Sequence, residues 1–220
     1  MNKINKFSYN WLAHEINNKS IERHLDDIEG IVIDLGCGTS PFREDILKYA
    51  SKYIGIDWTE SNHELPHVSI LANLSQYLPL RENSADTVVS FQVLEHLPEP
   101  KIFLTECFRI LKSGGRLIIT IPFNWHVHEA PNDYYRYTRF GLEYLLNYNG
   151  YSDILIEENT GFWQMWILKF NYHTSKLAKG FTRFIFIPLW YFGQMLAPKL
   201  DYIDKHPQET ASYTVVAIKP

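Results

Sequence analysis

The sequence predicts an α/β fold built around a parallel β-sheet, and three observations lead to this prediction. Short β-branched and apolar runs alternate along the chain with segments in which apolar residues recur at helical spacing. The first of these runs, at residues 31–33, leads directly into a glycine turn, which is typical of a buried parallel strand. The chain has 220 residues, of which 45% are apolar, so it can bury the core of one sizeable domain.

Composition and charge argue against several classes of protein. The formal net charge of −4 argues against a nucleic-acid binder that depends on neutralising phosphates. Cys37 and Cys107 are the only cysteines, which favours reduced thiols over a disulfide scaffold. Residues 1–10 are polar and basic and lack the apolar segment of a signal peptide. We therefore expect a cytoplasmic protein.

The N-terminal residues 1–29 predict one or two helices that cap the edge of the sheet, because apolar residues recur there at helical spacing. Alternatively, Tyr9 and Trp11 close a ligand cleft.

The glycine turn at residues 34–38, with the sequence DLGCG, is the centre of the prediction. Its glycines permit positive φ angles and let a ligand approach the main chain without meeting a Cβ atom. Ser40 as N-cap and Pro41 as first residue predict a helix over 42–50. The free N–H groups at the start of that helix would suit a carboxylate or phosphate.

Two further strands are expected after this unit, at residues 53–57 and 68–71. Asp57 ends the first of them about twenty residues beyond the glycines, the spacing at which a carboxylate accepts hydrogen bonds from a ribose diol. Asn73 follows the second strand. Its side-chain oxygen could accept from an adenine amine, or the residue could simply stabilise a turn.

The fourth and fifth strands are expected at residues 85–91 and 116–121, separated by a helix over 101–112. Residues 92–97 follow the fourth strand at the carboxyl end of the sheet, where ligands of open α/β sheets bind. The glycines of the segment 113–115 should end the helix. The apolar residues expected on its buried side are Ile102, Phe103, Cys107 and Ile110.

An aromatic and polar loop at 123–137 precedes a helix that Thr138 can cap and that continues to Tyr148. The last two strands are expected at 151–157 and 213–218. On one side of the helix the spacing places Phe140, Tyr144, Leu145 and Tyr148.

A long apolar insertion separates the last two strands. Its second apolar run, at residues 181–196, is too short and too interrupted for a membrane-spanning helix, which needs about 20 apolar residues. Its aromatic residues are interspersed with Lys and Arg, so it fits a buried lid, a homodimer contact or a peripheral contact with the inner face of an anionic membrane. We thus divide the single domain into a helical cap (1–29), a core (30–160), the insertion (161–208) and the last strand (209–220).

Four motifs in this order resemble the class I S-adenosylmethionine-dependent methyltransferases. They are the turn 34–38, the acid in Ile56-Asp57, and the segments QVLEH at 92–96 and LKSGGR at 111–116. The resemblance covers about residues 31 to 121. It implies a seven-stranded, mostly parallel, Rossmann-like sheet with strand order 3-2-1-4-5-7-6, an antiparallel last strand, helices on both faces and a helical insertion before the last strand.

The resemblance also implies a binding site for S-adenosylmethionine. Gly36 and Gly38 would lie under its methionine part, Asp57 would hold its ribose, and Trp58 or Leu74 would flank its adenine. Many relatives carry an aspartate where Asn73 stands. Pro41 replaces the glycine or alanine that a dinucleotide fingerprint needs, which disfavours a nicotinamide cofactor. The predicted cofactor-binding residues are Asp34, Gly36, Cys37, Gly38, Asp57, Trp58, Asn73, Leu74, Phe91 and Gln92.

Methyl transfer to a hydroxyl is helped by a nearby base, and the loop after the fifth strand offers candidates. We favour His128 or Asp133, with His96 as a third candidate. His126, His128, Glu129 and Asp133 could instead hold a divalent cation, but two loop histidines two residues apart are a weak signal, so no metal is predicted.

The same loop suits a carbohydrate or phosphate-bearing acceptor, because aromatic faces stack on sugar rings and Arg binds anions. Alternatively, its aromatic residues simply pack beneath the insertion. Its segment DYYRYT at 133–138 resembles that of methyltransferases of bacterial surface-polysaccharide and lipopolysaccharide biosynthesis. The predicted acceptor-binding residues are His126, Tyr134, Tyr135, Arg136 and Tyr137.

The sequence therefore predicts O-methylation of a sugar hydroxyl in a surface glycan or lipid-linked precursor. One alternative is a small apolar acceptor such as a quinone or polyketide, with the insertion walling its pocket. Another is a non-catalytic protein that binds the cofactor and acts as a partner.

Overall fold

The computed structural model describes residues 4–59 and 65–220, and this part of the chain contains a seven-stranded sheet. The strand order is β3-β2-β1-β4-β5-β7-β6, as predicted. The strands are β1 (Gly30–Leu35), β2 (Ala50–Asp57), β3 (Val68–Leu71), β4 (Ala85–Phe91), β5 (Leu111–Pro122), β6 (Ser152–Glu158) and β7 (Ser212–Ile218). The α-helices are α1 (Trp11–Glu22), α2 (Arg43–Ile46), α3 (Pro100–Ile110), α4 (Arg139–Tyr148), α5 (Phe162–Ser175) and α6 (Arg183–Ile203).

Strands β1 to β5 pair in parallel, and β7 runs antiparallel to both β5 and β6. In the register of β1 with β2, Asp34 lies opposite Gly55 and Leu35 opposite Ile56. The carboxyl ends of β1, β2 and β4 therefore reach the same edge of the sheet, where their connecting loops can form one site.

Each face of the sheet is covered by its own apolar cluster. On one face Ile33 packs with Phe103 of α3 and Leu142 of α4. On the other face Val32 packs with Ile21 of α1 and Ile46 of α2. Side chains along β1 alternate between the two faces of the sheet, so both apolar clusters receive residues from this strand, which explains why Val32 and Ile33 are both apolar.

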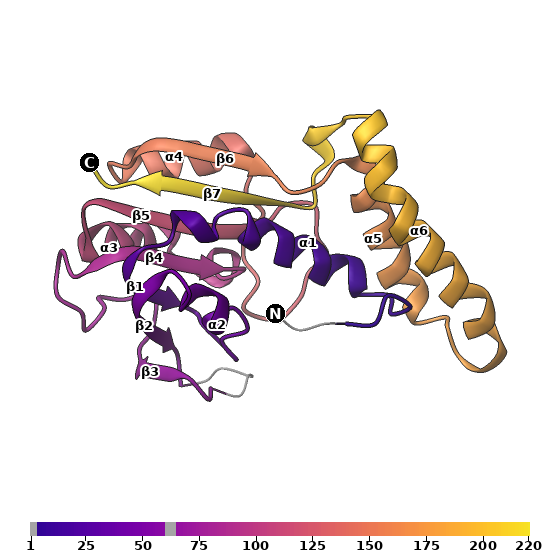
Figure 1. Cartoon of the computed structure of the whole chain (residues 1–220), viewed down its shortest axis with the longest axis horizontal. Coiled ribbons are helices and arrows are strands. Elements are labelled where there is room, and N and C mark those ends of the chain that lie inside the picture. The colour runs from indigo at the N-terminus through magenta and orange to yellow at the C-terminus, as the bar shows by residue number, and fades with distance from the viewer. Residues whose placement is uncertain (1–3, 60–64) are drawn as a thin grey trace.

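The insertion forms a helical hairpin of α5 and α6 that projects away from the sheet (Figure 1). The helices approach closely at Gly193, where an added Cβ would lie 2.8 Å from Ile167 Cδ1. The buried Gln194 of α6 links the hairpin to the N-terminal region, since its Oε1 accepts from the main-chain N–H of Leu12 and its Nε2 donates to the Lys6 carbonyl. Among the described residues, no helix is long and apolar enough to cross a bilayer.

The helix predicted over 42–50 is wrong in length. Only one turn, α2, forms, because β2 already begins at Ala50. Ser40 adopts a φ of +54° and its main-chain N–H donates to the Cys37 carbonyl, so it continues the loop, and Phe42 occupies the N-cap position.

One predicted helix face, that of α3, needs correction, and for α4 the structure shows which side is buried. On α3, Ile102 is exposed, whereas the other three residues expected on the buried side are buried, and the helix ends at Ile110 because β5 starts at the next residue. On α4 the buried side is formed by leucines, while Phe140, Tyr144 and Tyr148 are exposed. Helical spacing identified residues that share a side, but it did not determine which side faces the sheet.

The N-terminal region covers the hairpin. The ring of Tyr9 packs against those of Tyr172 and Trp190, with centroids 5.1 and 5.9 Å apart. Trp11 packs with the cluster that α1 forms with α5. Neither residue lines the pocket at the carboxyl ends of the strands, so the structure supports packing rather than closure of a cleft. Residues 1–3 of the predicted cap lie outside the described residues.

Candidate functional site

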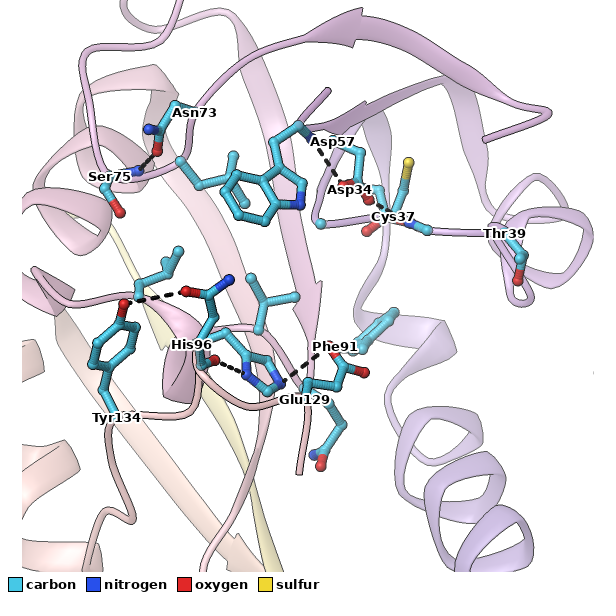
Figure 2. A pocket seen from close by; sticks show the side chains of 18 of the residues that line it. Asp34, Cys37, Thr39, Asp57, Asn73, Ser75, Phe91, His96, Glu129 and Tyr134 are labelled. Carbon is cyan, nitrogen blue, oxygen red and sulfur yellow. Dashed lines mark hydrogen bonds and ion pairs between the residues drawn. The ribbon is translucent and has the colours of Figure 1, made fainter. Parts of the chain in front are cut away.

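A pocket of roughly 710 Å³ opens at the carboxyl ends of β1, β2 and β4. Its volume lies in the range of small-molecule sites. All ten residues predicted to bind a cofactor line it, together with His96 and Tyr134. Figure 2 shows Asp34, Cys37 and Asp57 on one side of the pocket and His96, Glu129 and Tyr134 on the other.

The glycine turn presents bare main chain to this pocket. Gly36 has a φ of +78°, and a Cβ added there would lie 2.5 Å from Val93 Cγ2. The N–H groups of Gly36 and Cys37 both donate to the Ile56 carbonyl, at 2.8 and 3.2 Å, which ties the turn to the end of β2. Only glycine satisfies both the backbone angle and the space at position 36.

Asp57 is held in a fixed orientation by the main chain. Its Oδ2 accepts from the Gly38 N–H at 2.7 Å and its Oδ1 from the Trp58 N–H at 2.8 Å. The carboxylate is buried but lines the pocket. Each oxygen keeps a further lone pair, so the group can accept two hydrogen bonds from a diol.

Asp34 lies deeper at the end of β1 and accepts a hydrogen bond from the Tyr53 hydroxyl at 2.5 Å. Burial, with an added contribution from the nearby charge of Asp57, raises the pKa of Asp34 to about 7. Burial likewise raises the pKa of the Cys37 thiol to about 12, so this thiol is not a nucleophile at neutral pH.

The loop after β3 supports the turn interpretation of Asn73. Its Oδ1 accepts from the Ser75 N–H at 2.9 Å, so that oxygen stabilises the turn in addition to lining the pocket (Figure 2). Beyond β4, Gln92 adopts a φ of +57°, and its Nε2 donates to Thr120 Oγ1. This backbone angle bends the chain at the pocket wall.

The charged side chains that line the pocket all have the same sign. Of the described residues that line it, Asp34, Asp57 and Glu129 are acidic and none is Lys or Arg. A ligand that carries positive charge is therefore favoured, whereas the pyrophosphate of a dinucleotide would meet carboxylates without a compensating cation.

The opposite wall is built by η2 (Leu94–His96), which follows β4, and by the loop 123–137. His96 Nδ1 lies 2.5 Å from the Asn132 carbonyl. A carbonyl only accepts, so Nδ1 carries the proton and Nε2 presents a lone pair in the neutral ring. Tyr134 lines the same wall, with its hydroxyl 3.3 Å from Asn132 Oδ1.

The predictions for Asp133 and Arg136 need correction. Arg136 binds both oxygens of Asp133, at 2.6 and 2.8 Å, and also donates to the His126 carbonyl. These hydrogen bonds hold the pKa of Asp133 well below its usual range. Neither residue lines the pocket, so Asp133 is not placed as a base nor Arg136 as an anion binder. The pair instead fixes the shape of the loop.

Three other acceptor-loop residues also lie away from the pocket lining. Tyr137 is buried, with its hydroxyl directed at the Leu94 carbonyl, and the Tyr135 hydroxyl donates to the Pro98 carbonyl. The ring of His126 packs against that of Tyr172, and burial with the nearby charge of Arg136 lowers its pKa. Of the predicted acceptor-binding residues, only Tyr134 reaches the pocket.

His128 lies behind His96, with ring centroids 4.8 Å apart, and does not line the pocket. Between them lies Glu95, a fully buried acid that we did not single out from the sequence. The sequence signal was its position beside His96 directly after a strand at the carboxyl edge of the sheet.

Comparison with known proteins agrees with this geometry. Residues 33–119 match the family model described as a methyltransferase domain. A probable S-adenosylmethionine-dependent methyltransferase of Mycolicibacterium smegmatis is 36% identical over 96 residues, 41% of this chain and 37% of that protein. A ubiquinone biosynthesis O-methyltransferase of Coxiella burnetii is 26% identical over 153 residues, 62% of this chain and 59% of that protein. The chain thus spans less than two thirds of either relative.

Solved structures extend the likeness across the whole sheet. A SAM-dependent methyltransferase from Archaeoglobus fulgidus has a TM-score of 0.61 at 20% identity, over 94% of each chain. A Haemonchus contortus phosphoethanolamine N-methyltransferase, solved with S-adenosylhomocysteine, has a TM-score of 0.60 at 20% identity, over 98% of this chain and 57% of that one. These likenesses confirm the predicted fold. The family match covers residues 33–119 of the chain, and the solved structures extend the likeness in fold alone.

Proposed function

We propose that this chain is a class I S-adenosylmethionine-dependent methyltransferase and an active O-methyltransferase, which the match of residues 33–119 to a methyltransferase domain supports. We further propose that its acceptor is a sugar hydroxyl in a surface glycan or a lipid-linked precursor. The observation that carries the proposal is the pocket itself, which combines bare main chain at Gly36 with the fixed carboxylate of Asp57 and lacks Lys and Arg among its described lining residues.

The residues of the pocket fit S-adenosylmethionine in shape and charge. The turn at Gly36 and Gly38 would lie against its amino-acid part, Asp57 would accept from its ribose hydroxyls, and Trp58 would flank its adenine. Its sulfonium and amino groups are cationic, and they match the acidic lining. When bound, this cofactor supplies an electrophilic methyl group.

The protein's own contribution is to position the acceptor and receive its proton. The wall formed by His96, Glu129 and Tyr134 is polar and faces the acidic side of the pocket (Figure 2). Because Asn132 fixes the tautomer of His96, its Nε2 can accept a proton from a hydroxyl that reaches the pocket. We therefore assign this role to His96, which lines the pocket, rather than to the predicted His128 or Asp133, which do not.

The hairpin supports an acceptor attached to a lipid. Between residues 161 and 200 the chain has five Lys and Arg residues and no Asp or Glu, although the whole protein is acidic. Phe181, Phe184 and Phe192 are 79%, 63% and 67% exposed on the same hairpin. Exposed apolar side chains among cations suit the surface of an anionic membrane, and we propose that the hairpin makes this peripheral contact.

A second candidate function is O-methylation of a quinone-like acceptor. It is favoured by the likeness to the Coxiella burnetii protein, which extends over 62% of this chain. The exposed aromatic side chains of the hairpin would then guide an apolar substrate rather than dock on a membrane.

The test is a transfer assay with methyl-labelled S-adenosylmethionine. The full chain is incubated with a lipid-linked glycan extract, with a quinol and with neither, and Asp57→Ala serves as the inactive control. Label in the glycan that depends on Asp57 supports the proposal, and label in the quinol alone supports the second candidate. Binding of the cofactor without transfer to either would favour the non-catalytic alternative.

A further inference from the structure

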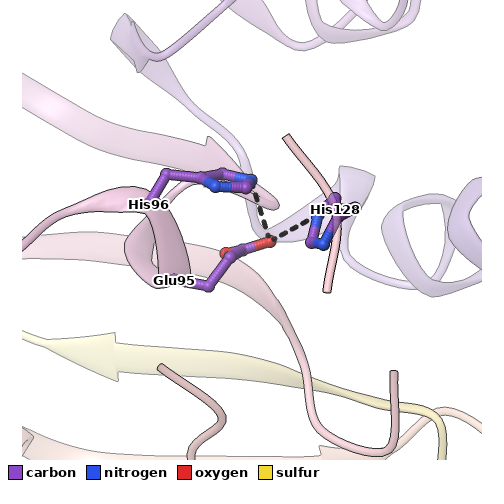
Figure 3. Close-up of side chains that lie close together, drawn as sticks. All are labelled: Glu95, His96 and His128. Carbon is purple, nitrogen blue, oxygen red and sulfur yellow. Dashed lines mark ion pairs between the residues drawn. The ribbon is translucent and has the colours of Figure 1, made fainter. Parts of the chain in front are cut away.

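Three side chains with metal-ligating atoms converge behind the wall of the pocket. Glu95 Oε1 lies 3.6 Å from His96 Nε2 and 3.9 Å from His128 Nε2. One ligand atom from each of the three residues can be chosen so that all lie within 4.8 Å of one another. Figure 3 shows the two imidazole rings facing the same carboxylate oxygen.

Glu95 is the unusual member of this group. Its side chain is fully buried, and neither carboxylate oxygen has a hydrogen-bond partner among the described residues. A buried carboxylate without partners is costly, so groups of this kind are normally paired or bound to a metal.

The outer nitrogen of His96 has the partner that metal-binding histidines usually have, whereas that of His128 lies near both an acceptor and a donor. His96 Nδ1 contacts the Asn132 carbonyl at 2.5 Å, and His128 Nδ1 lies 3.4 Å from Asp133 Oδ2. Such acceptors hold the proton on Nδ1 and leave the Nε2 lone pair for a cation. Arg136 Nη2 also lies 3.3 Å from His128 Nδ1 and favours the other tautomer in the metal-free ring, so a bound cation would select between the two.

The loop that carries His128 is fixed in place. Asp133 accepts from the main-chain N–H of His128 at 2.8 Å and is itself bound by Arg136. The main-chain N–H groups of Tyr134 and Tyr135 donate to the carbonyl of Glu95. The two segments that supply the ligand atoms are therefore joined to each other by hydrogen bonds.

From this geometry we propose that Glu95, His96 and His128 bind one divalent cation whose open coordination positions take an oxygen of the methyl acceptor. Two imidazoles and one carboxylate suit Zn²⁺ and the borderline transition metals better than Mg²⁺ or Ca²⁺. Ligands of one such ion lie roughly 3.4 Å apart, so from the present limit of 4.8 Å the ligand atoms need to approach by at most about 1.4 Å.

The part of the proposal that concerns the acceptor rests on the proposed function. His96 lines the pocket, so an ion on its Nε2 would lie at the wall where the acceptor binds. His96 would then be a ligand and no longer the base: the cation would lower the pKa of the acceptor hydroxyl, and its proton would pass to the Glu129 carboxylate, which lines the same wall. Acceptors with adjacent hydroxyl groups would be favoured, since two oxygens can share the open positions.

The experiment measures binding of Zn²⁺ and Co²⁺ to the full chain, freed of metal with a chelator, by calorimetry and by the visible spectrum of the Co²⁺ form. We expect one site per chain, and a loss of affinity of roughly 100-fold or more in both Glu95→Gln and His128→Gln. His173→Gln, which replaces an exposed histidine on α5, is the matched control and should bind as the wild type does. S-adenosylhomocysteine binding is measured on every variant.

Each outcome either supports or overturns the proposed cation site. Saturable binding that both cluster variants lose and the control retains supports the site. Absent binding in the wild type, or equal affinity in all variants, overturns it. If Glu95→Gln does not fold, His128→Gln carries the same test. Failure of the wild type to bind S-adenosylhomocysteine would refute the proposed function, whatever the metal result.

Discussion

The pocket buries charged side chains, whereas the α5–α6 hairpin exposes large apolar ones. In the pocket two carboxylates are nearly covered, with Asp34 4% and Asp57 7% exposed. On the hairpin large aromatic side chains are uncovered, with Phe181 79% and Phe192 67% exposed. Either arrangement costs free energy in the isolated chain, so each marks a place where another molecule is expected.

The two regions differ in what fixes their shape. The pocket follows from the topology of the sheet, because the ends of β1, β2 and β4 must meet and their main-chain groups hold Asp57. The hairpin is fixed on its inner side by the buried Trp190 and Gln194, while its outer side exposes Phe184, Leu189 and Phe192. We therefore expect changes in the pocket to affect folding and cofactor binding, and changes on the outer side of the hairpin to affect docking.

The largest expected effect is that of Gly36→Ala. The new Cβ would meet Val93 at a backbone angle that alanine rarely adopts, so we expect a loss of about 2–4 kcal/mol in the free energy of unfolding. Gly180→Ala, in the hairpin, is the matched control, since it has positive φ but nothing within 4 Å of its Cβ. It should lose only about 1 kcal/mol. Urea denaturation measures both, and equal losses would contradict the role of the close contact.

The second prediction compares two carboxylates that accept main-chain hydrogen bonds, the buried Asp57 and the half-buried Asp201. Asp57→Asn should weaken S-adenosylhomocysteine binding roughly 10–100-fold, because a charged acceptor for the ribose is lost. Asp201 of α6 accepts from the main-chain N–H groups of Gly161, Trp163 and Gln164 at the start of α5. Asp201→Asn should cost about 1 kcal/mol of stability and leave the affinity unchanged. Calorimetry and thermal unfolding on both variants separate these effects, and a weaker affinity in Asp201→Asn would undermine the separation of the two regions.

The third prediction concerns the outer side of the hairpin. Phe184→Ser combined with Phe192→Ser should weaken flotation with anionic vesicles about tenfold or more, since both rings lose apolar burial in the interface. Stability should change by less than about 1 kcal/mol. Tyr144→Ser removes a ring that is 61% exposed on α4 and should leave flotation unchanged. If the wild-type protein does not float with the vesicles but forms dimers, the homodimer alternative is favoured.

The smallest expected effect is a pH dependence of the ratio between the affinities for S-adenosylmethionine and S-adenosylhomocysteine. The pKa of Asp34 is about 7, so this carboxyl is mostly neutral at pH 6 and mostly ionised at pH 8. The ionised form attracts the sulfonium that S-adenosylmethionine carries and S-adenosylhomocysteine lacks. The ratio of the two affinities should therefore rise about threefold between these pH values in wild type and stay flat in Asp34→Asn. An equal rise in that variant would assign the dependence to another group.

Most of the sheet and the cofactor side of the pocket were predictable from sequence because both depend on local signals. The strand β4 lies where its apolar run predicted it, and Asp57 follows directly from where β2 ends. The residue Glu95 was missed because its importance depends on His128, which lies 33 positions further along the chain. No periodicity links two such segments, and only the folded loop brings them together.

The acceptor loop illustrates a second limit of sequence analysis. Asp133 was predicted to act as a base and Arg136 to bind the acceptor, but in the structure the two side chains bind each other. In the same way, the aromatic side of α4 was identified as a shared side, although it points to solvent. A sequence lists the groups that are able to bind, and the fold determines which of them are already bound.

The segment that leaves β6 for the hairpin and the segment that returns to β7 are joined by hydrogen bonds at two threonines. Thr160 and Thr210 are buried, with the Thr160 N–H donating to Thr210 Oγ1 at 3.1 Å and the Ala211 N–H to Thr160 Oγ1 at 2.8 Å. Evolution can therefore lengthen, shorten or exchange everything between these two threonines while the register of β6 and β7 stays intact. Related proteins could keep one methyl-donor chemistry and still be delivered to quite different surfaces.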